Sequence, residues 1–282
     1  ETVAEVREQV KAWRKEGLTV GLVPTMGYLH EGHQSLIAKA CAQNDRVVVS
    51  VFVNPTQFGP NEDLESYPRD LEHDAALCES TGAALIFHPT PEEMYPKGFC
   101  SFVDMDVLTK ELCGLSRPVH FRGVCTVVSK LLHIVQPDKA YFGEKDAQQL
   151  AVIRRMVLDL NMNVEIVGCP IVRESDGLAK SSRNTYLSPA ERKAALVLSK
   201  SIFAGKQLAE AGETDAAKLV QAMTKIIEAE PLAKIDYVKV VDLMTMQQIP
   251  KLDRPFLAAI AVYIGKTRLI DNFMMQAGGT AE

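Results

Sequence analysis

Apolar residues recur at helical spacing in some segments and run together in others, and these two patterns predict the elements of the chain. Among the first 171 residues, strands are expected at 18–24, 46–53, 83–87, 139–142 and 164–169. Helices are expected at 2–16, 34–44, 68–80, 123–135 and 145–160. Alternating strands and helices form right-handed crossovers, and the β-branched segment 46–53 is typical of a strand covered on both faces. We therefore expect an α/β fold, with a Rossmann-like parallel sheet over residues 1–171.

The pattern changes near residue 170. Ser188-Pro189-Ala190-Glu191 predicts a helix start, with Ser as the N-cap, Pro in the first position and Glu three residues after Ser. Helices are expected at 188–210 and 215–230, and strands at 235–243, 256–264 and 267–273. We therefore expect a smaller α+β domain over residues 172–282.

Polar loops follow three of the expected strands, after Val23, after Val53 and after Phe142. The carboxyl ends of parallel strands meet at one edge of the sheet, where ligands bind. The first loop carries His30 and His33 at the point where strand gives way to helix. A helix N-terminus offers unpaired N–H groups and partial positive charge to a phosphate, and two imidazoles there add hydrogen-bond donors.

Two other interpretations of His30 and His33 are surface or capping histidines and a metal site. The run His30-Glu31-Gly32-His33 is one residue short of the HExxH pattern of metalloproteases. Gly27 and Gly32 allow the backbone to approach a ligand closely. The strand–loop–helix setting therefore favours chemistry on a nucleoside triphosphate.

Two further polar runs point the same way. In Gly143-Glu144-Lys145-Asp146, Lys145 is placed to meet a phosphate as a point charge, and Asp146 suits a ribose hydroxyl or a metal-bound water. In Lys180-Ser181-Ser182-Arg183, two hydroxyls lie between two cations, which suits a mobile phosphate clamp. Taken alone, the first run also fits a polar helix start and the second a solvated loop.

Two glutamines are candidates for binding a small polar substrate. Gln57 follows the second strand, and Gln149 lies on the helix that opens at Lys145. An amide both donates and accepts hydrogen bonds, so each is able to orient a polar group. Each in isolation also fits a surface glutamine.

Composition narrows the function class. The 282 residues are 47% hydrophobic and 24% charged with a net charge of −5, which is typical of a globular protein and argues against a broad nucleic-acid surface. The longest apolar run, 256–264, is too short to span a membrane. Six cysteines without a CxxC pair indicate reduced core thiols rather than disulfides or zinc, and no signal-peptide pattern is present. We expect a cytoplasmic protein with no membrane or nucleic-acid partner.

Together and in this order, the motifs resemble the pantothenate synthetase (pantoate–β-alanine ligase) family over essentially the whole chain. The segments that carry the resemblance are PTMGYLHEGH at 24–33, FVNPTQF at 52–58, YPRD at 67–70, RPVHFRGV at 117–124, YFGEKDAQQL at 141–150, KSSRNTYLS at 180–188 and RLIDN at 268–272. This family belongs with the class I aminoacyl-tRNA synthetases and small nucleotidyltransferases. Their HIGH signature resembles the His30–His33 run, and their KMSKS loop is similar to residues 180–183.

The resemblance implies a two-step ligation. Pantoate would attack the α-phosphate of ATP to give pantoyl adenylate and pyrophosphate, and the amine of β-alanine would then displace AMP to give pantothenate. It implies catalytic roles for His33 as the main phosphate donor, His30 beside it and Lys145 on the phosphate oxygens. It also implies Mg²⁺ on the pyrophosphate and a homodimer.

The resemblance also implies the binding residues. The ATP site would comprise Met26, Gly27, Tyr28, Leu29, His30, Glu31, Gly32, His33, Gly143, Glu144, Lys145, Asp146, Val172, Lys180, Ser181, Ser182 and Arg183. Gln57 and Gln149 would bind pantoate, and Gln57 would also bind β-alanine. Val127 and Val128 would flank the gem-dimethyl group of pantoate, although their spacing also fits core packing. Asp74 is the candidate Mg²⁺ ligand.

Three positions depart from the family pattern: Lys180 replaces an apolar residue, Ala147 an aromatic one, and Cys125 a Ser or Leu. Other functions fit only part of the pattern. An enzyme that moves AMP onto a phosphate acceptor would share both histidines but would not explain the two glutamines. A non-catalytic nucleotide sensor is disfavoured because both histidines, Lys145 and Arg183 are intact. A tRNA synthetase is disfavoured because the chain is short and acidic.

Overall fold

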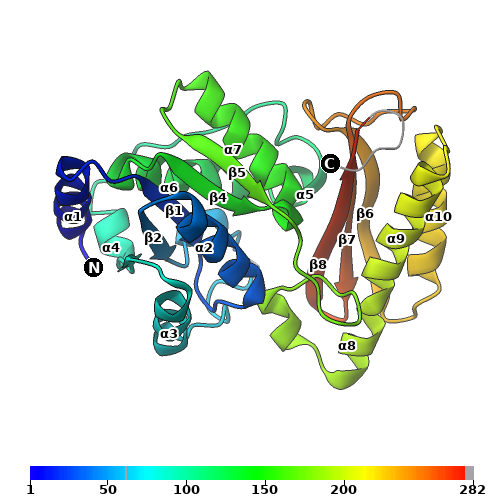
Figure 1. Cartoon of the computed structure of the whole chain (residues 1–282). Coiled ribbons are helices and arrows are strands. Elements are labelled where there is room, and N and C mark those ends of the chain that lie inside the picture. The colour runs from blue at the N-terminus through cyan, green and yellow to red at the C-terminus, as the bar shows by residue number, and fades with distance from the viewer. Residues whose placement is uncertain (61, 277–282) are drawn as a thin grey trace. The chain divides into compact units, whose positions relative to one another are not determined.

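The computed structural model describes residues 1–60 and 62–276, and the chain forms two compact units (Figure 1). The first unit comprises residues 1–105, 117–144 and 152–170, and the second comprises residues 106–116, 145–151 and those from 171 onward. The second unit therefore includes two segments from within the first 171 residues. The division into domains 1–171 and 172–282 stays a prediction.

A parallel sheet of five strands forms the centre of the first unit, in the order β3-β2-β1-β4-β5. The strands are β1 (Val20–Thr25), β2 (Arg46–Val51), β3 (Leu85–Phe87), β4 (Lys139–Gly143) and β5 (Glu165–Cys169). This arrangement confirms the predicted α/β fold. Thr25 pairs with Val51 at the carboxyl end of β1 and β2, so the loops that follow these strands leave from the same edge of the sheet.

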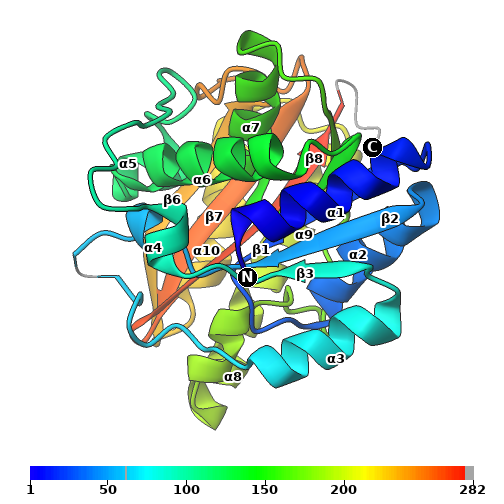
Figure 2. The same cartoon turned by 90° about the vertical axis from the view of Figure 1, so that its left-hand side faces the viewer.

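Helices cover this sheet. They are α1 (Val3–Lys15), α2 (Glu31–Gln43), α3 (Leu71–Thr81), α4 (Pro91–Met94) and α6 (His120–Val135), and the short 3₁₀ turn η1 (Pro55–Gln57) follows β2. Helix α2 contacts β1, β2 and β4, where Ile37 packs into a core with Val47 and Val49. Helix α6 contacts β1, and α1 lies beside α6 (Figure 2).

The second unit is built on an antiparallel sheet of three strands, β6 (Ala233–Asp242), β7 (Phe256–Ile264) and β8 (Thr267–Met275), with β7 in the centre. Helices α9 (Leu196–Glu210) and α10 (Ala216–Glu228) pack together and against this sheet. The continuous apolar run at 256–264 is explained by this position, because all of its residues except Tyr263 are buried. This confirms the predicted α+β unit.

Five further elements complete the described part of the chain. They are η2 (Glu144–Asp146), α7 (Ala147–Asp159), α5 (Leu112–Ser116), η3 (Ser182–Tyr186) and α8 (Pro189–Ala194). Among the described residues, no helix combines the length and apolar character that crossing a membrane requires.

The structure corrects the prediction of one continuous helix over 188–210. The helix is broken at the buried Ala195, which ends α8 and precedes α9. There the N–H of Leu198 bonds to the carbonyl of Ala195, three residues back, so the turn is tightened relative to an α-helix. The predicted N-cap is present, because Ser188 and Glu191 form a capping box.

Candidate active site

His30 and His33 build the N-terminus of α2 from their own side chains. His30 is the N-cap residue, and its Nδ1 accepts a hydrogen bond from the N–H of Gly32 at 3.1 Å. The N–H of His30 donates in turn to Nδ1 of His33 at 3.3 Å. This is a capping box made of two histidines, in place of the usual Ser or Thr with Glu. Helix α2 therefore begins at Glu31, three residues before the predicted start at residue 34.

These two bonds decide which ring nitrogen carries the proton. A backbone N–H only donates, so Nδ1 of each ring accepts, and the proton of each neutral imidazole lies on Nε2. The two rings lie together, with centroids 4.1 Å apart. Two Nε2–H donors are thus presented at the positive end of a helix, which is the chemistry expected for binding a phosphate.

The loop before His30 is held by Asp74 of α3. The two oxygens of this buried carboxylate accept hydrogen bonds from the N–H groups of Tyr28 at 2.8 Å and Leu29 at 2.6 Å. Gly27 and Tyr28 have positive φ angles of 81° and 51°, which for Tyr28 is a strained conformation. Nε2 of the neighbouring His73 also contacts the carbonyl of Leu29 at 3.1 Å. Asp74 thus stabilises the strained loop that leads to the two histidines.

The role of Asp74 as a Mg²⁺ ligand stays a prediction. Both of its oxygens are engaged by backbone N–H groups. Over residues 1–60 and 62–276, no group of three or more His, Cys, Asp or Glu side chains is placed to hold a metal ion. Each carboxylate oxygen has a second lone pair, so these two hydrogen bonds neither require nor rule out a cation at Asp74.

Gln57 lies in a polar cluster centred on Asn54. The Nδ2 of Asn54 donates to Oε1 of Gln57 at 2.9 Å, and its Oδ1 accepts from the hydroxyl of Tyr95 at 2.6 Å and that of Thr56 at 3.0 Å. The Nε2 of Gln57 contacts the sulfur of Met26 at 3.2 Å. The structure therefore brings two predicted residues, Met26 and Gln57, into contact. Gln57 is buried and oriented rather than a surface glutamine.

Gly123 allows α6 to approach this cluster. An ideal Cβ at this position would lie 2.4 Å from the carbonyl oxygen of Thr56 and 2.5 Å from N and Cα of Gln57. All three are backbone atoms, which cannot move aside as a flexible side chain can. The glycine of the RPVHFRGV motif is therefore required by the contact between α6 and η1.

We expect Gly123→Ala to destabilise the protein by about 1–3 kcal/mol, the usual cost of overpacking a filled interior. The added methyl group would push η1, and Gln57 with it, away from α6. Denaturant unfolding measures the loss. Gly59→Ala is the matched control, because its nearest contact would be an ordinary 3.4 Å to the Glu62 side chain. Equal stability of the two variants would contradict this account.

Three other predicted residues of α6 lie inside the protein. Val127 and Val128 are both buried, and Cys125 is completely inaccessible. Burial raises the pKa of the Cys125 thiol to about 12, which keeps it protonated and unreactive. All six cysteines are free thiols. Four of them are buried as the prediction of core thiols expects, whereas Cys41 is half-buried and Cys100 is exposed.

In the second unit, Lys145 is fixed through its main chain. Its carbonyl accepts a hydrogen bond from Nδ2 of Asn272 at 2.9 Å, and its Nζ lies 3.9 Å from a carboxylate oxygen of Asp146. Lys145 and Ser181 line the same small cavity, together with Asp271. The structure therefore brings together the GEKD, KSSR and RLIDN motifs, which are far apart in the sequence.

The segment 180–183 is organised by two of its own residues. The side chain of Ser181 caps η3 by accepting from the N–H of Arg183 at 3.3 Å. The N–H of Lys180 bonds to the carbonyl of Val172 at 2.9 Å, which links two predicted ATP-binding residues. The Nζ of Lys180 forms an ion pair with Glu174 at 2.8 Å. Lys180 thus has an acidic partner, and its departure from the family pattern adds an ion pair.

Gln149 is half-buried in the first turn of α7. Its neighbour Gln148, which sequence reasoning missed, is buried and holds the preceding loop: it accepts from the N–H of Cys113 at 2.9 Å and donates to the carbonyls of Leu108 and Glu111 at 2.8 and 2.7 Å. Sequence spacing offers no signal for this role, because the partners lie 35 to 40 residues earlier in the chain.

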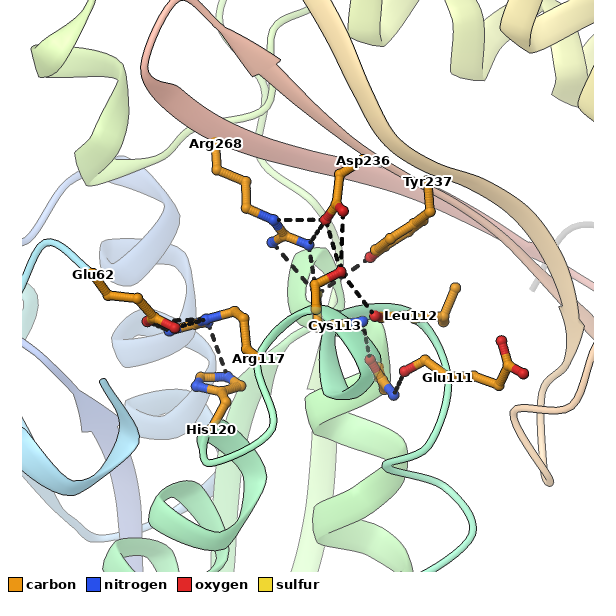
Figure 3. Close-up of polar contacts among 11 residues, drawn as sticks. Glu62, Glu111, Leu112, Cys113, Arg117, His120, Asp236, Tyr237 and Arg268 are labelled. Carbon is orange, nitrogen blue, oxygen red and sulfur yellow. Dashed lines mark hydrogen bonds and ion pairs between the residues drawn. The ribbon is translucent and has the colours of Figure 1, made fainter. Parts of the chain in front are cut away.

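Arg268 of the RLIDN motif belongs to a buried cluster in the second unit (Figure 3). Its guanidinium donates to a carboxylate oxygen of Asp236 at 2.7 and 3.0 Å and lies 3.7 Å from the sulfur of Cys113. The same sulfur lies 3.3 Å from the hydroxyl of Tyr237, and burial raises the pKa of that hydroxyl well above its usual value. The cluster fastens α5, which contains Cys113, to β6 and β8.

Comparison with known proteins agrees with this arrangement. Residues 1–274 match the family model described as Pantoate-beta-alanine ligase. The chain is 68% identical to the pantothenate synthetase of Ruminiclostridium cellulolyticum over 272 residues, 96% of each chain. It is 47% identical to the solved pantothenate synthetase of Thermus thermophilus, with a TM-score of 0.91 and 97% of each chain covered. A Francisella tularensis pantoate-beta-alanine ligase, solved with beta-gamma ATP and beta-alanine, is 35% identical, with a TM-score of 0.80 and coverage of 99% of this chain and 98% of that one.

Proposed function

The chain belongs to the pantoate–β-alanine ligase family, and from this premise we propose that it condenses pantoate with β-alanine through a pantoyl adenylate. In the first step, a carboxylate oxygen of pantoate attacks the α-phosphorus of ATP, and pyrophosphate leaves. In the second step, the amine of β-alanine attacks the acyl carbon, AMP leaves with the C–O electron pair, and the amine loses a proton. The observation that carries this proposal is the pair of Nε2–H donors of His30 and His33 at the N-terminus of α2.

The two histidines supply the charge stabilisation of the first step. Negative charge gathers on the α-phosphate and the leaving pyrophosphate, and fixed donors stabilise it without reorganising during the reaction. We assign His33 as the main donor, with His30 beside it. The capping bonds of both rings hold the Nε2–H tautomers in place before ATP binds, which is the preorganisation that such catalysis requires.

Residues of the second unit are assigned to the other phosphates. Lys145 contacts phosphate oxygens as a point charge, and Ser181, Ser182 and Arg183 bind the β- and γ-phosphates. Because Lys180 is paired with Glu174, we give it the role of holding this segment rather than of a primary phosphate contact. The remaining ATP contacts are assigned as the resemblance implies, with the Val172 backbone near adenine.

Gln57 and Gln149 are assigned to pantoate, and Gln57 also to β-alanine. Asn54 fixes the amide of Gln57 with Oε1 as the acceptor of its bond, so the NH₂ group is the end that a carboxylate or hydroxyl would meet. Mg²⁺ would neutralise the pyrophosphate and be carried by the ATP phosphates, as Mg²⁺ commonly is. Asp74 stays the proposed Mg²⁺ ligand, and its oxygens also accept hydrogen bonds from the loop backbone. We also propose that the enzyme is a cytoplasmic homodimer.

Product release tests the two-step mechanism. Enzyme, ATP and Mg²⁺ are incubated with pantoate and β-alanine, separately and together, and pyrophosphate and AMP are measured. When pantoate is added without β-alanine, we expect about one pyrophosphate to form per active site, as in a burst during which an intermediate accumulates on the enzyme. Sustained AMP release is expected only when β-alanine is also added. ATP binding without any response to pantoate would contradict the proposed substrate and favour another acid or a phosphate acceptor.

A further inference from the structure

The main-chain carbonyl of Gln57 is held by the histidine of the RPVHFRGV segment, to which no role in the reaction has been assigned. His120 begins α6 and is buried, and its Nδ1 lies 3.1 Å from this carbonyl oxygen. Nη2 of Arg117 lies 3.5 Å from the same oxygen. On its other side, Gln57 packs against Gly123. The backbone of Gln57 is therefore bonded at its C=O group by His120 and lies close to α6 at Gly123.

Two contacts of the His120 ring fit the neutral Nδ1–H tautomer. Its Nε2 lies 3.3 Å from Nη1 of Arg117, and a guanidinium can only donate, so Nε2 accepts. The carbonyl of Gln57 can only accept, so Nδ1 donates. The neutral Nδ1–H tautomer satisfies both bonds, whereas a proton on Nε2 would face a cation. This is the opposite tautomer to that of His30 and His33.

Arg117 is itself held by an acidic partner. Its Nε lies 3.0 and 3.1 Å from the two carboxylate oxygens of Glu62, and its Nη2 also pairs with that carboxylate. Figure 3 shows Glu62, Arg117 and His120 in a row. The guanidinium is thus oriented by Glu62 on one side and orients the imidazole on the other. The row ends at the carbonyl of Gln57.

We propose that His120 is a positioning residue for pantoate binding, which acts through its Nδ1–H bond to the Gln57 carbonyl. The proposal rests on the assignment of Gln57 to pantoate. The side-chain amide of Gln57 keeps its bond to Asn54 only while its backbone stays in place. When the bond from His120 is lost, the amide moves relative to the substrate, so pantoate binding weakens while ATP binding is largely retained.

Three variants of His120 separate its bond to the Gln57 carbonyl from its bond to Arg117. In His120→Asn, the amide nitrogen reaches the position of Nδ1 and donates to the Gln57 carbonyl. In His120→Gln, the amide oxygen reaches the position of Nε2 and accepts from Arg117, but the donor of residue 120 to the Gln57 carbonyl is lost and only the longer contact from Arg117 remains. His120→Ala removes both. His133→Gln, an exposed position on the same helix, is the matched control.

We expect His120→Gln and His120→Ala to raise the KM for pantoate about tenfold, the effect of losing one hydrogen bond. The KM for ATP should change less, and His120→Asn should recover most of the pantoate affinity. The ¹⁵N shifts of the ring should show a protonated Nδ1. Equal pantoate KM values for the Asn and Gln variants, or a ring protonated at Nε2, would overturn the proposal.

Gln57→Ala tests the underlying assignment separately. An unchanged pantoate KM in that variant would remove Gln57 from the pantoate site, and the positioning role of His120 with it. The ¹³C shift of the Gln57 carbonyl would still test whether His120 donates a hydrogen bond to that carbonyl. It should change in His120→Gln but not in His120→Asn if His120 donates to that oxygen. A raised pantoate KM in Gln57→Ala with no effect of any His120 substitution would leave the proposed function standing and refute the role of His120.

Discussion

His33→Asn is expected to slow formation of pyrophosphate from ATP and pantoate by about 10²–10³-fold, the loss typical of removing one transition-state donor. Asn is chosen because its side-chain oxygen reaches the position of Nδ1 and keeps accepting from the N–H of His30, which caps α2. The substitution thus removes the Nε2–H donor and leaves the helix start intact. Pantoate-dependent exchange of pyrophosphate into ATP measures this step alone.

The matched control is His33→Gln, whose amide NH₂ group reaches the position of Nε2. It should recover part of the rate although it lacks the capping acceptor. The opposite order, with the Asn variant faster than the Gln variant, would show that His33 serves the helix N-terminus rather than the phosphate. A near-normal exchange rate in His33→Asn would remove His33 from catalysis.

The positions of the strands and of the loop that carries His30 and His33 were predictable because they depend on local patterns. The apolar runs before Thr25 and Val51 specify buried strands, and polar residues follow each of them. The placement of His30 and His33 at a helix start follows from that order. In the sequence, capping stands as an alternative to phosphate binding, and the structure shows that both histidines cap α2, while their role as phosphate donors stays a prediction.

The supporting residues were not predictable, because their partners are distant in the sequence. Asp74 binds backbone groups 45 and 46 residues before it, and His120 binds a carbonyl 63 residues before it. The residue type suggests a metal role for Asp74, since carboxylate oxygens suit both cations and N–H groups, but it does not reveal the bonds to Tyr28 and Leu29. Only the fold shows which of these groups lies opposite each oxygen.

The buried ion pair between Arg173 and Asp271 is expected to give the largest stability effect in the second unit. Two guanidinium nitrogens of Arg173 donate to the two oxygens of Asp271 at 2.7 and 2.9 Å, and the N–H of Asn272 donates to one of them at 2.8 Å. Asp271 is almost completely buried. Asp271→Ala would leave the guanidinium with no carboxylate in a mostly buried place. The expected loss is about 3–5 kcal/mol, the usual cost of breaking a buried pair.

Denaturant unfolding of the full chain tests this, with Asp253→Ala as the control. The Arg254–Asp253 pair is about half exposed, so its loss should change the stability far less because water screens it. The double variant Arg173→Met/Asp271→Leu should recover most of the stability lost in Asp271→Ala, since apolar residues in place of both charges remove the desolvation cost. If the double variant is as unstable as the single one, the loss comes from the bond to Asn272 and not from an uncompensated charge. That outcome would move the structural role from the ion pair to the backbone turn that presents Asn272 to the carbonyl of Lys145.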